Sequence, residues 1–213
     1  IQRIISERRK NTTFKTAVGQ TLIRIPFHIN NEATVLTRTF PKRPFVPADE
    51  RARAQRCEEI LTIQAMGLKK RLAHTNSRTA VVGISGGLDS TLALLVTARA
   101  FDMLGRDKKD IIAVTMPCFG TTDRTYNNAC EMTRKTGATL KEVPIADAVN
   151  IHFRDIGQDP ENHDVTYENS QARERTQVLM DIANRTGGMV IGTGDMSELA
   201  LGWATYNLSL IHI

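Results

Sequence analysis

The chain has 213 residues, of which 41% are hydrophobic and 24% charged, a composition that fits one globular domain, or one domain with part of another. No apolar run approaches the roughly 20 residues that cross a bilayer, and no secretory signal opens the chain, so we expect a cytoplasmic protein that does not contact membranes. The net charge of +5 comes from residues 1–80, which hold 16 Lys and Arg against 6 Asp and Glu; because this excess lies outside the motif-rich part of the chain, we expect no binding to nucleic acid.

Residues 1–48 contain short segments of alternating polarity, such as TLIRI and ATVLTRTF, separated by prolines. The pattern predicts strands and loops, which are too few to close a core by themselves. The chain begins with isoleucine rather than methionine, so we expect a fragment of a longer protein.

A long helix is predicted over residues 49–74, with Asp49 as a suitable N-cap. Apolar side chains recur at helical spacing on one face, at Cys57, Leu61, Leu68 and Leu72, and the other face is rich in Arg and Lys. We interpret the basic face as the solvated or packing face of a linker helix rather than as a binding surface.

From Thr79 onward the sequence alternates between strand and helix patterns. Apolar, β-branched runs predict strands at residues 79–84, 111–116, 139–145 and 188–193, and segments of helical length lie at 88–104, 123–136, 146–156 and 169–186. Gly105, Gly137 and Gly187 stand where helix C-caps belong. This alternation predicts an α/β fold with a parallel sheet covered on both faces, and such sheets bind ligands beyond the carboxyl ends of their strands.

The stretch VVGISGGLDSTLALL, residues 81–95, begins within the first of these strands and leads into a helix. Gly86 and Gly87 could do no more than allow a tight turn with positive φ. Three features favour a phosphate site: the turn opens a helix, Ser85 and Ser90 add hydroxyl groups, and Asp89 can meet a phosphate through a divalent cation. No lysine follows, as a P-loop requires. The loop therefore suits a pyrophosphate that leaves, which indicates adenylation by ATP.

The three cysteines, Cys57, Cys118 and Cys130, are widely spaced and form no metal-binding pattern. We therefore expect free thiols in a reducing cytoplasm. Cys118 could be a nucleophile, but no histidine lies near it in the sequence, so a small buried side chain is the favoured interpretation.

The sequence SGGLDS resembles the pyrophosphate-loop (PP-loop) signature of the ATP pyrophosphatase group, which includes GMP synthetase, asparagine synthetase, tRNA-modifying ligases and NAD synthetase. Three further stretches, MPCFGTTDRTYNNA, YENSQARERTQVLMDIAN and IGTGDMSELALGWATYN, are similar to glutamine-dependent NAD synthetase. Residues 40–75 resemble the end of that family's glutaminase domain and its linker. The resemblance implies a doubly wound parallel sheet of the adenine nucleotide alpha hydrolase-like kind, preceded by a remnant of a nitrilase-like α/β domain.

The same resemblance implies a division of the chain into four parts. Residues 1–48 would be the C-terminal remnant of the glutaminase domain, 49–78 the linker helix, 79–207 the synthetase domain without its C-terminal end, and 208–213 a tail without a counterpart in the family. The family's glutaminase residues would lie upstream of the first residue, so we expect no glutamine hydrolysis by this chain.

The resemblance also assigns site residues. The ATP contacts are Gly83, Ile84, Ser85, Gly86, Gly87, Leu88, Asp89, Ser90 and Thr193. The magnesium ligands are Asp89 and Glu198, although Glu198 alone could be an acid favoured at a helix N-terminus. The contacts to the substrate, deamido-NAD, are Asn169, Arg173, Trp203, Ala204, Thr205 and Tyr206.

Several polar residues beside these motifs have two interpretations. Thr121, Asp123 and Arg124 could help to close the ATP pocket, and Asp123 could equally cap the next helix. Glu174 and Arg175 are interpreted as surface charges.

The implied enzyme is a carbon–nitrogen ligase that uses ATP and Mg²⁺ and needs no nucleophile from the protein. The nicotinate carboxylate of deamido-NAD attacks ATP to give an acyl adenylate and pyrophosphate, and ammonia then displaces AMP to give NAD. In the parent protein the ammonia would come from glutamine, and we expect a homo-oligomer. The alternatives are another PP-loop adenylating ligase, similar to GMP synthetase or a tRNA ligase, and an inactive nucleotide-binding fragment; the fragment alone is expected to be inactive.

Overall fold

A computed structural model of the chain describes residues 2–10, 23, 25–28, 33, 35, 37–120, 122–194 and 196–201. The chain divides into two compact units, Ile1–Phe45 and Val46–Ile213. The division falls close to the boundary at residue 48 that the sequence predicts between a domain remnant and a linker. The assignment of the first unit to a glutaminase domain remains a prediction.

The first unit contains helix α1, Gln2–Lys10. The prediction of strands and loops for residues 1–48 was wrong here, because glutamine, glutamate, arginine and lysine favour helix. Glu7 and Lys10, one turn apart, also form an ion pair of 2.8 Å. Among the described residues between 23 and 48, none lies in a strand.

In the part of the second unit that the structure describes, four strands form a parallel sheet. They are β1 (Ala80–Gly83), β2 (Ile111–Thr115), β3 (Thr139–Glu142) and β4 (Met189–Ile191), in the spatial order β3-β2-β1-β4. Each lies inside a predicted strand, and each neighbouring pair is parallel. The chain moves outward from β1 to β3 and then returns to the other side of β1. Doubly wound sheets open a ligand crevice at this point.

Helices connect the strands. They are α3 (Leu88–Leu104), α4 (Asp123–Thr136), α5 (Ala146–Ile156) and α6 (Val165–Thr186); a further helix, α7 (Met196–Leu201), follows β4, and a short 3₁₀ turn η1 (Lys108–Asp110) precedes β2. The first three have the predicted bounds, and Gly105, Gly137 and Gly187 cap the predicted helix ends. α6 begins earlier than predicted, because Asp164 accepts hydrogen bonds from the Thr166 and Tyr167 N–H groups at 2.8 and 3.1 Å. None of the described helices is long and apolar enough to span a membrane.

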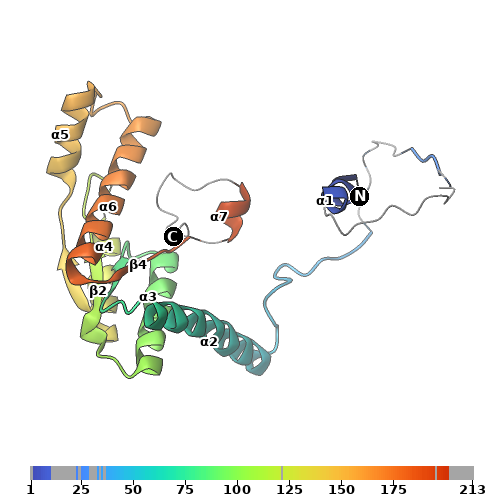
Figure 1. Cartoon of the computed structure of the whole chain (residues 1–213). Helices are drawn as coiled ribbons and strands as arrows, with labels where there is room; N and C mark the ends of the chain where they lie inside the picture. Colours follow the sequence, from blue (N-terminus) through green and yellow to red (C-terminus); the bar gives the residue numbers. More distant parts are fainter. Residues whose placement is uncertain are drawn as a thin grey trace. The chain divides into compact units, whose positions relative to one another are not determined.

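Helices cover both faces of the sheet, as predicted (Figure 1). On one face, Val82 of β1 lies in a buried cluster with Phe101 of α3. On the other face, Val81 of β1 lies in a cluster with Leu179 and Ile182 of α6. Alternate residues of β1 thus enter two separate cores. The predicted doubly wound α/β fold is confirmed.

Helix α2 (Glu50–His74) begins where predicted, because Asp49 accepts a hydrogen bond from the Ala52 N–H at 2.7 Å. Ala65 and Leu72 are fully buried in the cluster that includes α3. The predicted apolar face is wrong at Cys57, which is exposed, because the buried positions lie in the second half of the helix. This helix packs into the same unit as the sheet.

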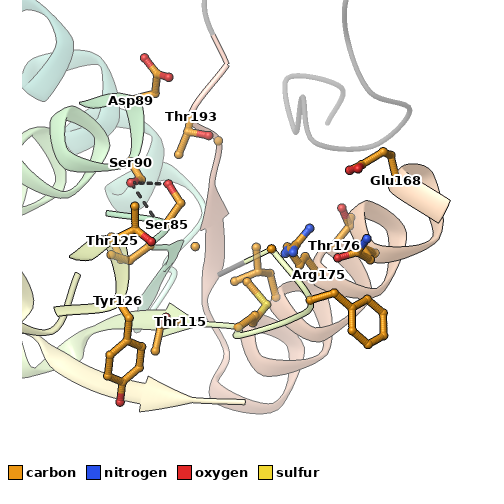
Figure 2. Close-up of a pocket in the computed structure, with 18 of the residues that line it drawn as sticks. Ser85, Asp89, Ser90, Thr115, Thr125, Tyr126, Glu168, Arg175, Thr176 and Thr193 are labelled. Carbon is orange, nitrogen blue, oxygen red and sulfur yellow. Dashed lines mark hydrogen bonds between the residues drawn. The ribbon is translucent and has the colours of Figure 1, made fainter. Parts of the chain in front are cut away.

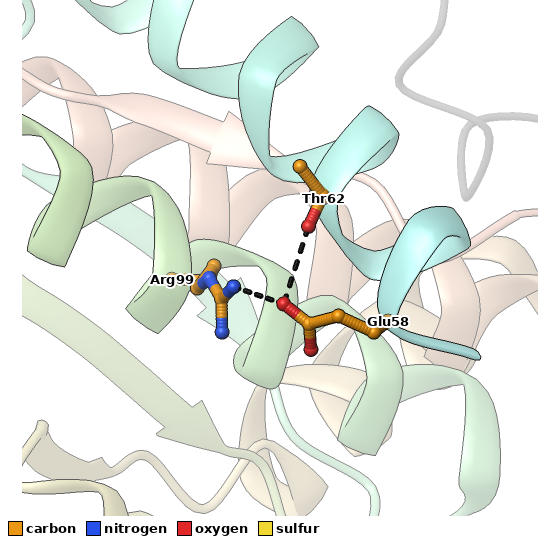
Figure 3. Close-up of polar contacts among 3 residues, drawn as sticks. All are labelled: Glu58, Thr62 and Arg99. Atoms are coloured by element: carbon orange, nitrogen blue, oxygen red, sulfur yellow. Dashed lines mark hydrogen bonds and ion pairs between the residues drawn. The ribbon is translucent and has the colours of Figure 1, made fainter. Parts of the chain in front are cut away.

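A polar contact also joins the first half of α2 to α3. Glu58 accepts hydrogen bonds from Arg99 of α3 and from Thr62 of its own helix, the latter at 3.4 Å (Figure 3). The side chains of Glu58 and Arg99 are 57% and 38% exposed, and exposed ion pairs contribute little to stability. Burial of the second half of α2, rather than this pair, attaches the helix to the sheet.

Leu72→Ala tests whether α2 is an integral part of this fold. We expect the free energy of unfolding to fall by about 2–5 kcal/mol, because a fully buried leucine is truncated, and urea-induced unfolding measures the change. Ile63→Ala on the same helix is the matched control, because Ile63 is 65% exposed. An equal loss in the two variants would contradict the assignment of Leu72 to the core.

Candidate functional site

A pocket of about 610 Å³ lies beyond the carboxyl ends of β1, β2 and β4. Its walls come from the loop after β1, the loop after β2 with the start of α4, the first part of α6, and the residues after β4. The described lining residues are Gly83, Ile84, Ser85, Asp89, Ser90, Thr115, Met116, Phe119, Gly120, Thr125, Tyr126, His163, Tyr167, Glu168, Gln171, Arg175, Thr176, Leu179, Ile191, Gly192 and Thr193. The pocket is therefore at the place where a doubly wound sheet binds its ligand.

The loop after β1 is held in shape by its own hydroxyl groups (Figure 2). The Oγ atoms of Ser85 and Ser90 are 3.1 Å apart, and Ser90 Oγ donates to the Gly87 carbonyl at 3.1 Å. The Gly87 N–H in turn donates to Ser85 Oγ at 3.2 Å. Ser90 is buried, whereas Asp89 beside it is exposed in the first turn of α3. Its carboxylate is therefore available to a ligand.

Gly86 allows this loop to touch the start of α4. Its φ is +79°, and a Cβ at this position would lie 2.1 Å from the Thr125 carbonyl oxygen. Both the backbone conformation and the close approach therefore require glycine. Gly87, the N-cap of α3, has a φ of −84°, so of the two only Gly86 needs the positive φ that the sequence suggested.

The predicted ATP contacts are distributed over two surfaces. Gly83, Ile84, Ser85, Asp89, Ser90 and Thr193 line the pocket. Among the described residues, Gly86, Gly87 and Leu88 are not part of its lining, and Gly86 and Leu88 border a separate groove between α2, α3 and α4. The part of the loop that faces the pocket is thus its beginning and the first turn of α3.

The two predicted magnesium ligands lie on different elements. Asp89 lines the pocket from α3, whereas Glu198 is exposed on α7 and is not among the described lining residues. In the described parts of the chain, no group of three or more His, Cys, Asp and Glu side chains is placed to hold a metal ion. A divalent cation here would need oxygen atoms from its ligand as well as from the protein.

Helix α6 forms the wall opposite the loop (Figure 2). Among the residues of α6 in the lining, Gln171, Arg175 and Leu179 are spaced by one turn and share one face. Gln171 is only 4% exposed. The interpretation of Arg175 as a surface charge was wrong, because this residue is partly buried and lines the pocket. Its one-turn spacing from Gln171 and Leu179 is informative only because the structure shows that this face of α6 lines the pocket.

The two predicted substrate contacts of α6 lie elsewhere on the helix. Asn169 is partly buried and Arg173 is exposed, and neither is among the described lining residues. Arg173 is two residues from Arg175, which places the two side chains on different sides of the helix. The remaining predicted substrate contacts, Trp203, Ala204, Thr205 and Tyr206, lie outside the described residues.

The aromatic rings of Phe119, His163 and Tyr167 form the far end of the pocket, and no sequence pattern predicted them. Tyr167 is at the centre: its ring centroid lies 4.3 Å from that of His163, 5.7 Å from that of Phe119 and 5.6 Å from that of Phe153. Phe119 is 43% exposed. These residues come from three separate segments, so no local spacing in the sequence identifies the group. The pocket thus has a polar end at the loop and an aromatic end that can receive a planar ring.

The start of α4 completes the pocket beside the loop. Thr122 is the N-cap of α4 and accepts a hydrogen bond from the Thr125 N–H at 3.4 Å, so the interpretation of Asp123 as the cap was wrong by one residue. Asp123 and Arg124 are exposed, and Thr125 and Tyr126 supply this part of the lining. Thr121 lies outside the described residues.

Tyr126 is fixed from outside the pocket. Its hydroxyl donates a hydrogen bond to Glu142 at the end of β3 at 2.6 Å. The carboxylate of Glu142 stabilises the protonated phenol and, with smaller contributions from Cys130, raises the pKa of Tyr126 to about 12. This hydrogen bond ties α4 to the edge strand of the sheet.

Cys118 is partly buried in the loop after β2. Burial raises the pKa of its thiol, and a hydrogen bond from the Phe119 backbone and the charge of Arg175 offset only part of that effect. A raised pKa lowers the thiolate fraction and hence the nucleophilicity. Cys118 is also absent from the described lining, which favours the interpretation of this residue as a partly buried packing side chain.

The sequence of this region is similar to one family. The model of the family described as NAD synthase matches residues 60–207, a range that contains the whole described lining of the pocket. The glutamine-dependent NAD(+) synthetase of Mycobacterium leprae is 47% identical over 177 residues, which are 81% of this chain and 26% of that protein. The chain thus spans about a quarter of the length of this curated relative.

Solved structures agree with the sequence comparison. Glutamine-dependent NAD+ synthetase from Acinetobacter baumannii, in complex with ADP, superposes with a TM-score of 0.64 and 30% identity over 70% of this chain and 28% of that chain. The NH3-dependent NAD synthetase from Campylobacter jejuni superposes with a TM-score of 0.62 and 25% identity over 71% of this chain and 62% of that one.

Gly86→Ala tests the contact between the loop and α4. We expect the free energy of unfolding to fall by at least about 1–2 kcal/mol, because the left-handed backbone costs that much for a residue other than glycine and the new Cβ displaces Thr125. Urea-induced unfolding measures the change. Gly87→Ala is the control, because its φ is −84° and the nearest neighbour of its Cβ would be Ser85 Oγ at 3.3 Å; equal losses in the two variants would contradict the role of Gly86.

The hydrogen bond between Tyr126 and Glu142 gives a pH-dependent signal. Because the pKa of Tyr126 is raised from 10.0 to about 12, its stabilising effect is complete below pH 10 and is lost as the pH rises toward 12. Burial also raises the pKa of Tyr167, so ultraviolet absorbance of tyrosinate should show the Tyr126 phenol as the late transition that depends on Glu142. In Glu142→Gln this phenol should titrate earlier, and an unchanged titration curve would contradict the assignment.

Proposed function

Because this chain belongs to the NAD synthase family, we propose that the protein that carries it converts deamido-NAD to NAD by ATP-dependent amidation, as a carbon–nitrogen ligase. The observation that supports this most strongly is the coincidence of two findings. The family match covers residues 60–207, and the pocket at the carboxyl ends of the strands lies wholly within that range and contains the SGGLDS loop.

ATP is the proposed nucleotide of this pocket. The loop after β1 leads into the first turn of α3, where backbone N–H groups have no partner within the helix and favour an anion. Ser85 and Thr193 add hydroxyl groups, and Asp89 adds a carboxylate. No lysine is present in the loop, which suits a pyrophosphate that departs rather than a γ-phosphate that is transferred.

Magnesium is the proposed metal, with Asp89 and Glu198 as its protein ligands. Carboxylate and phosphate oxygens are the donors that Mg²⁺ prefers, and one or two carboxylates suffice when the substrate supplies phosphates. The exposed Asp89 carboxylate at the loop fits this requirement. When bound, the ion would offset negative charge on the phosphate groups.

The reaction needs orientation and charge compensation rather than a protein nucleophile. The nicotinate carboxylate attacks the α-phosphorus of ATP, the bond to the bridging oxygen breaks, and pyrophosphate leaves. Ammonia then attacks the acyl carbon, loses a proton, and displaces AMP to leave the amide of NAD. In the first step the loop amides and hydroxyl groups hold the departing pyrophosphate.

Deamido-NAD is the proposed acceptor, with Asn169 and Arg173 of α6 as contacts. They are one turn apart on the helix, and Arg173 is exposed, so a contact there would lie outside the pocket described above. Trp203, Ala204, Thr205 and Tyr206 are proposed as further contacts. We also propose that glutamine supplies the ammonia in the whole protein and that the protein is a homo-oligomer.

The other PP-loop ligases that the loop alone permits are not favoured. The SGGLDS signature is shared by enzymes that adenylate other acceptors, but the family match extends from α2 through the segment after β4. Xanthosine monophosphate and tRNA are therefore expected to be inactive as acceptors.

Asp89→Asn tests the proposed function in the protein that carries this sequence. With ATP, Mg²⁺ and deamido-NAD, we expect release of pyrophosphate to fall by roughly 100-fold or more, because a charged group at the reacting phosphates is lost. A coupled pyrophosphate assay and chromatography of NAD measure the two products.

Asp102→Asn is the matched control, because it removes a carboxylate from the same helix that is 55% exposed and pairs with Lys108. The proposal would be wrong if Asp89→Asn released pyrophosphate at the wild-type rate. It would also be wrong if the wild-type protein used xanthosine monophosphate or tRNA in place of deamido-NAD.

A further inference from the structure

The pocket contains little positive charge for a site that is to hold a polyphosphate. The loop after β1 has no lysine, and among the described lining residues Asp89 and Glu168 are acidic whereas only His163 and Arg175 are basic. His163 stacks on Tyr167 at the aromatic end. Among the described lining residues, Arg175 is thus the one whose side chain carries a guanidinium or ammonium group for an anion.

The position of Arg175 follows from the packing of α6. Leu179, one turn later in the helix, covers the end of β1 so closely that a Cβ on Gly83 would lie 3.0 Å from its Cδ1. α6 leads into the start of β4, which is parallel to β1. The helix therefore runs opposite to the strands, and its earlier turns lie progressively beyond the strands' carboxyl ends. Arg175 therefore stands one turn, about 5–6 Å, beyond the end of β1.

One helical turn beyond the end of β1, Arg175 lies across the pocket from the loop after β1. Figure 2 shows Arg175 on the α6 side and Ser85, Asp89 and Ser90 on the other side. All of these residues line one cavity. A ligand held by the loop thus has Arg175 on its opposite side.

The Arg175 guanidinium is also without a counter-ion in the part of the chain that the structure describes. Two other arginines of the second unit do have partners: Arg99 pairs with Glu58, and Arg106 donates to the carbonyl oxygens of Ser77 and Arg78. No ion pair or hydrogen bond to a described residue involves Arg175. A partly buried cation without a partner is unfavourable until an anion satisfies it.

The thiol of Cys118, which feels the charge of Arg175, is not an adequate counter-ion for it. The charge of Arg175 lowers the pKa of the Cys118 thiol, but burial has the larger, opposite effect and the pKa is raised overall. The thiol is therefore neutral near pH 7 and leaves the guanidinium uncompensated.

We propose that Arg175 binds the phosphate groups of the nucleotide that the loop after β1 holds, and so supplies from α6 the cation that this lysine-less loop lacks. The assignment rests on the proposed function, whose nucleotide it describes further. A guanidinium fork can donate two parallel hydrogen bonds to phosphate oxygens and is always charged. As pyrophosphate leaves, this fixed charge offsets the negative charge that develops on the departing group.

The test compares arginines of the same helix. Calorimetry in the protein that carries this sequence measures the affinity for ATP with Mg²⁺, for adenosine, and for deamido-NAD, each added alone. In Arg175→Ala we expect ATP to bind about 10–100-fold more weakly, because a charge-assisted, two-point contact is lost. Adenosine, which has no phosphate, and deamido-NAD should each change by less than about twofold.

Two further variants keep the result interpretable. Arg175→Lys preserves the charge but not the planar fork, so its ATP affinity should lie between those of the wild type and Arg175→Ala. Arg185→Ala removes an exposed arginine from the last turn of α6 and should bind ATP like the wild type. Circular dichroism melting of each variant shows whether the fold is kept.

The outcomes separate this assignment from the proposed function. If Arg175→Ala or Arg175→Lys, folded, bound ATP as tightly as the wild type, the assignment would be overturned. A loss confined to deamido-NAD would also overturn it, because the charge would then serve the dinucleotide. If the wild type bound ATP but made no NAD, the proposed function would fail, while the ATP affinities of the variants would still decide the role of Arg175.

Discussion

Strand β1 has to be apolar on both faces, because α3 covers one and α6 covers the other. Its four residues alternate between two separate cores, with Val82 in the cluster of α3 and Val81 in the cluster of α6. At its carboxyl end the strand has glycine, and Leu179 of α6 occupies the space that a larger side chain would need. This packing sets the distance between α6 and the loop after β1, and that distance defines the pocket.

The loop and α6 supply different parts of the proposed chemistry. The loop provides hydroxyl groups, a helix N-terminus and the Asp89 carboxylate, all within a few residues of one another. α6 provides a wall with Gln171 and Arg175, and its start meets the aromatic group around Tyr167. In this proposal, backbone groups of the loop bind the nucleotide on one side and the fixed charge of Arg175 binds it on the other, without a mobile lysine. Such binding suits a reaction in which part of the nucleotide leaves.

Helix α2 was predicted to be a linker, but the structure includes it in a domain. Its sequence is basic and its first half is exposed, but Ala65 and Leu72 are fully buried in the cluster that includes α3. The match to the NAD synthase family also begins at residue 60, within this helix. The second half of α2 is therefore part of the core that supports α3, the helix whose first turn carries Asp89.

The sequence by itself determined the features that depend on near neighbours in the chain. Apolar runs and cap residues such as Asp49 defined the strands and the helix ends, and the spacing of Ser85, Asp89 and Ser90 defined the loop. It could not predict contacts between distant segments: the ring cluster around Tyr167, the approach of Gly86 to Thr125, or the choice between the two arginines of α6. Arg173 and Arg175 are two residues apart in the same motif, and only the packing of α6 on β1 decided which of them enters the pocket, because it fixes the rotation of the helix about its axis.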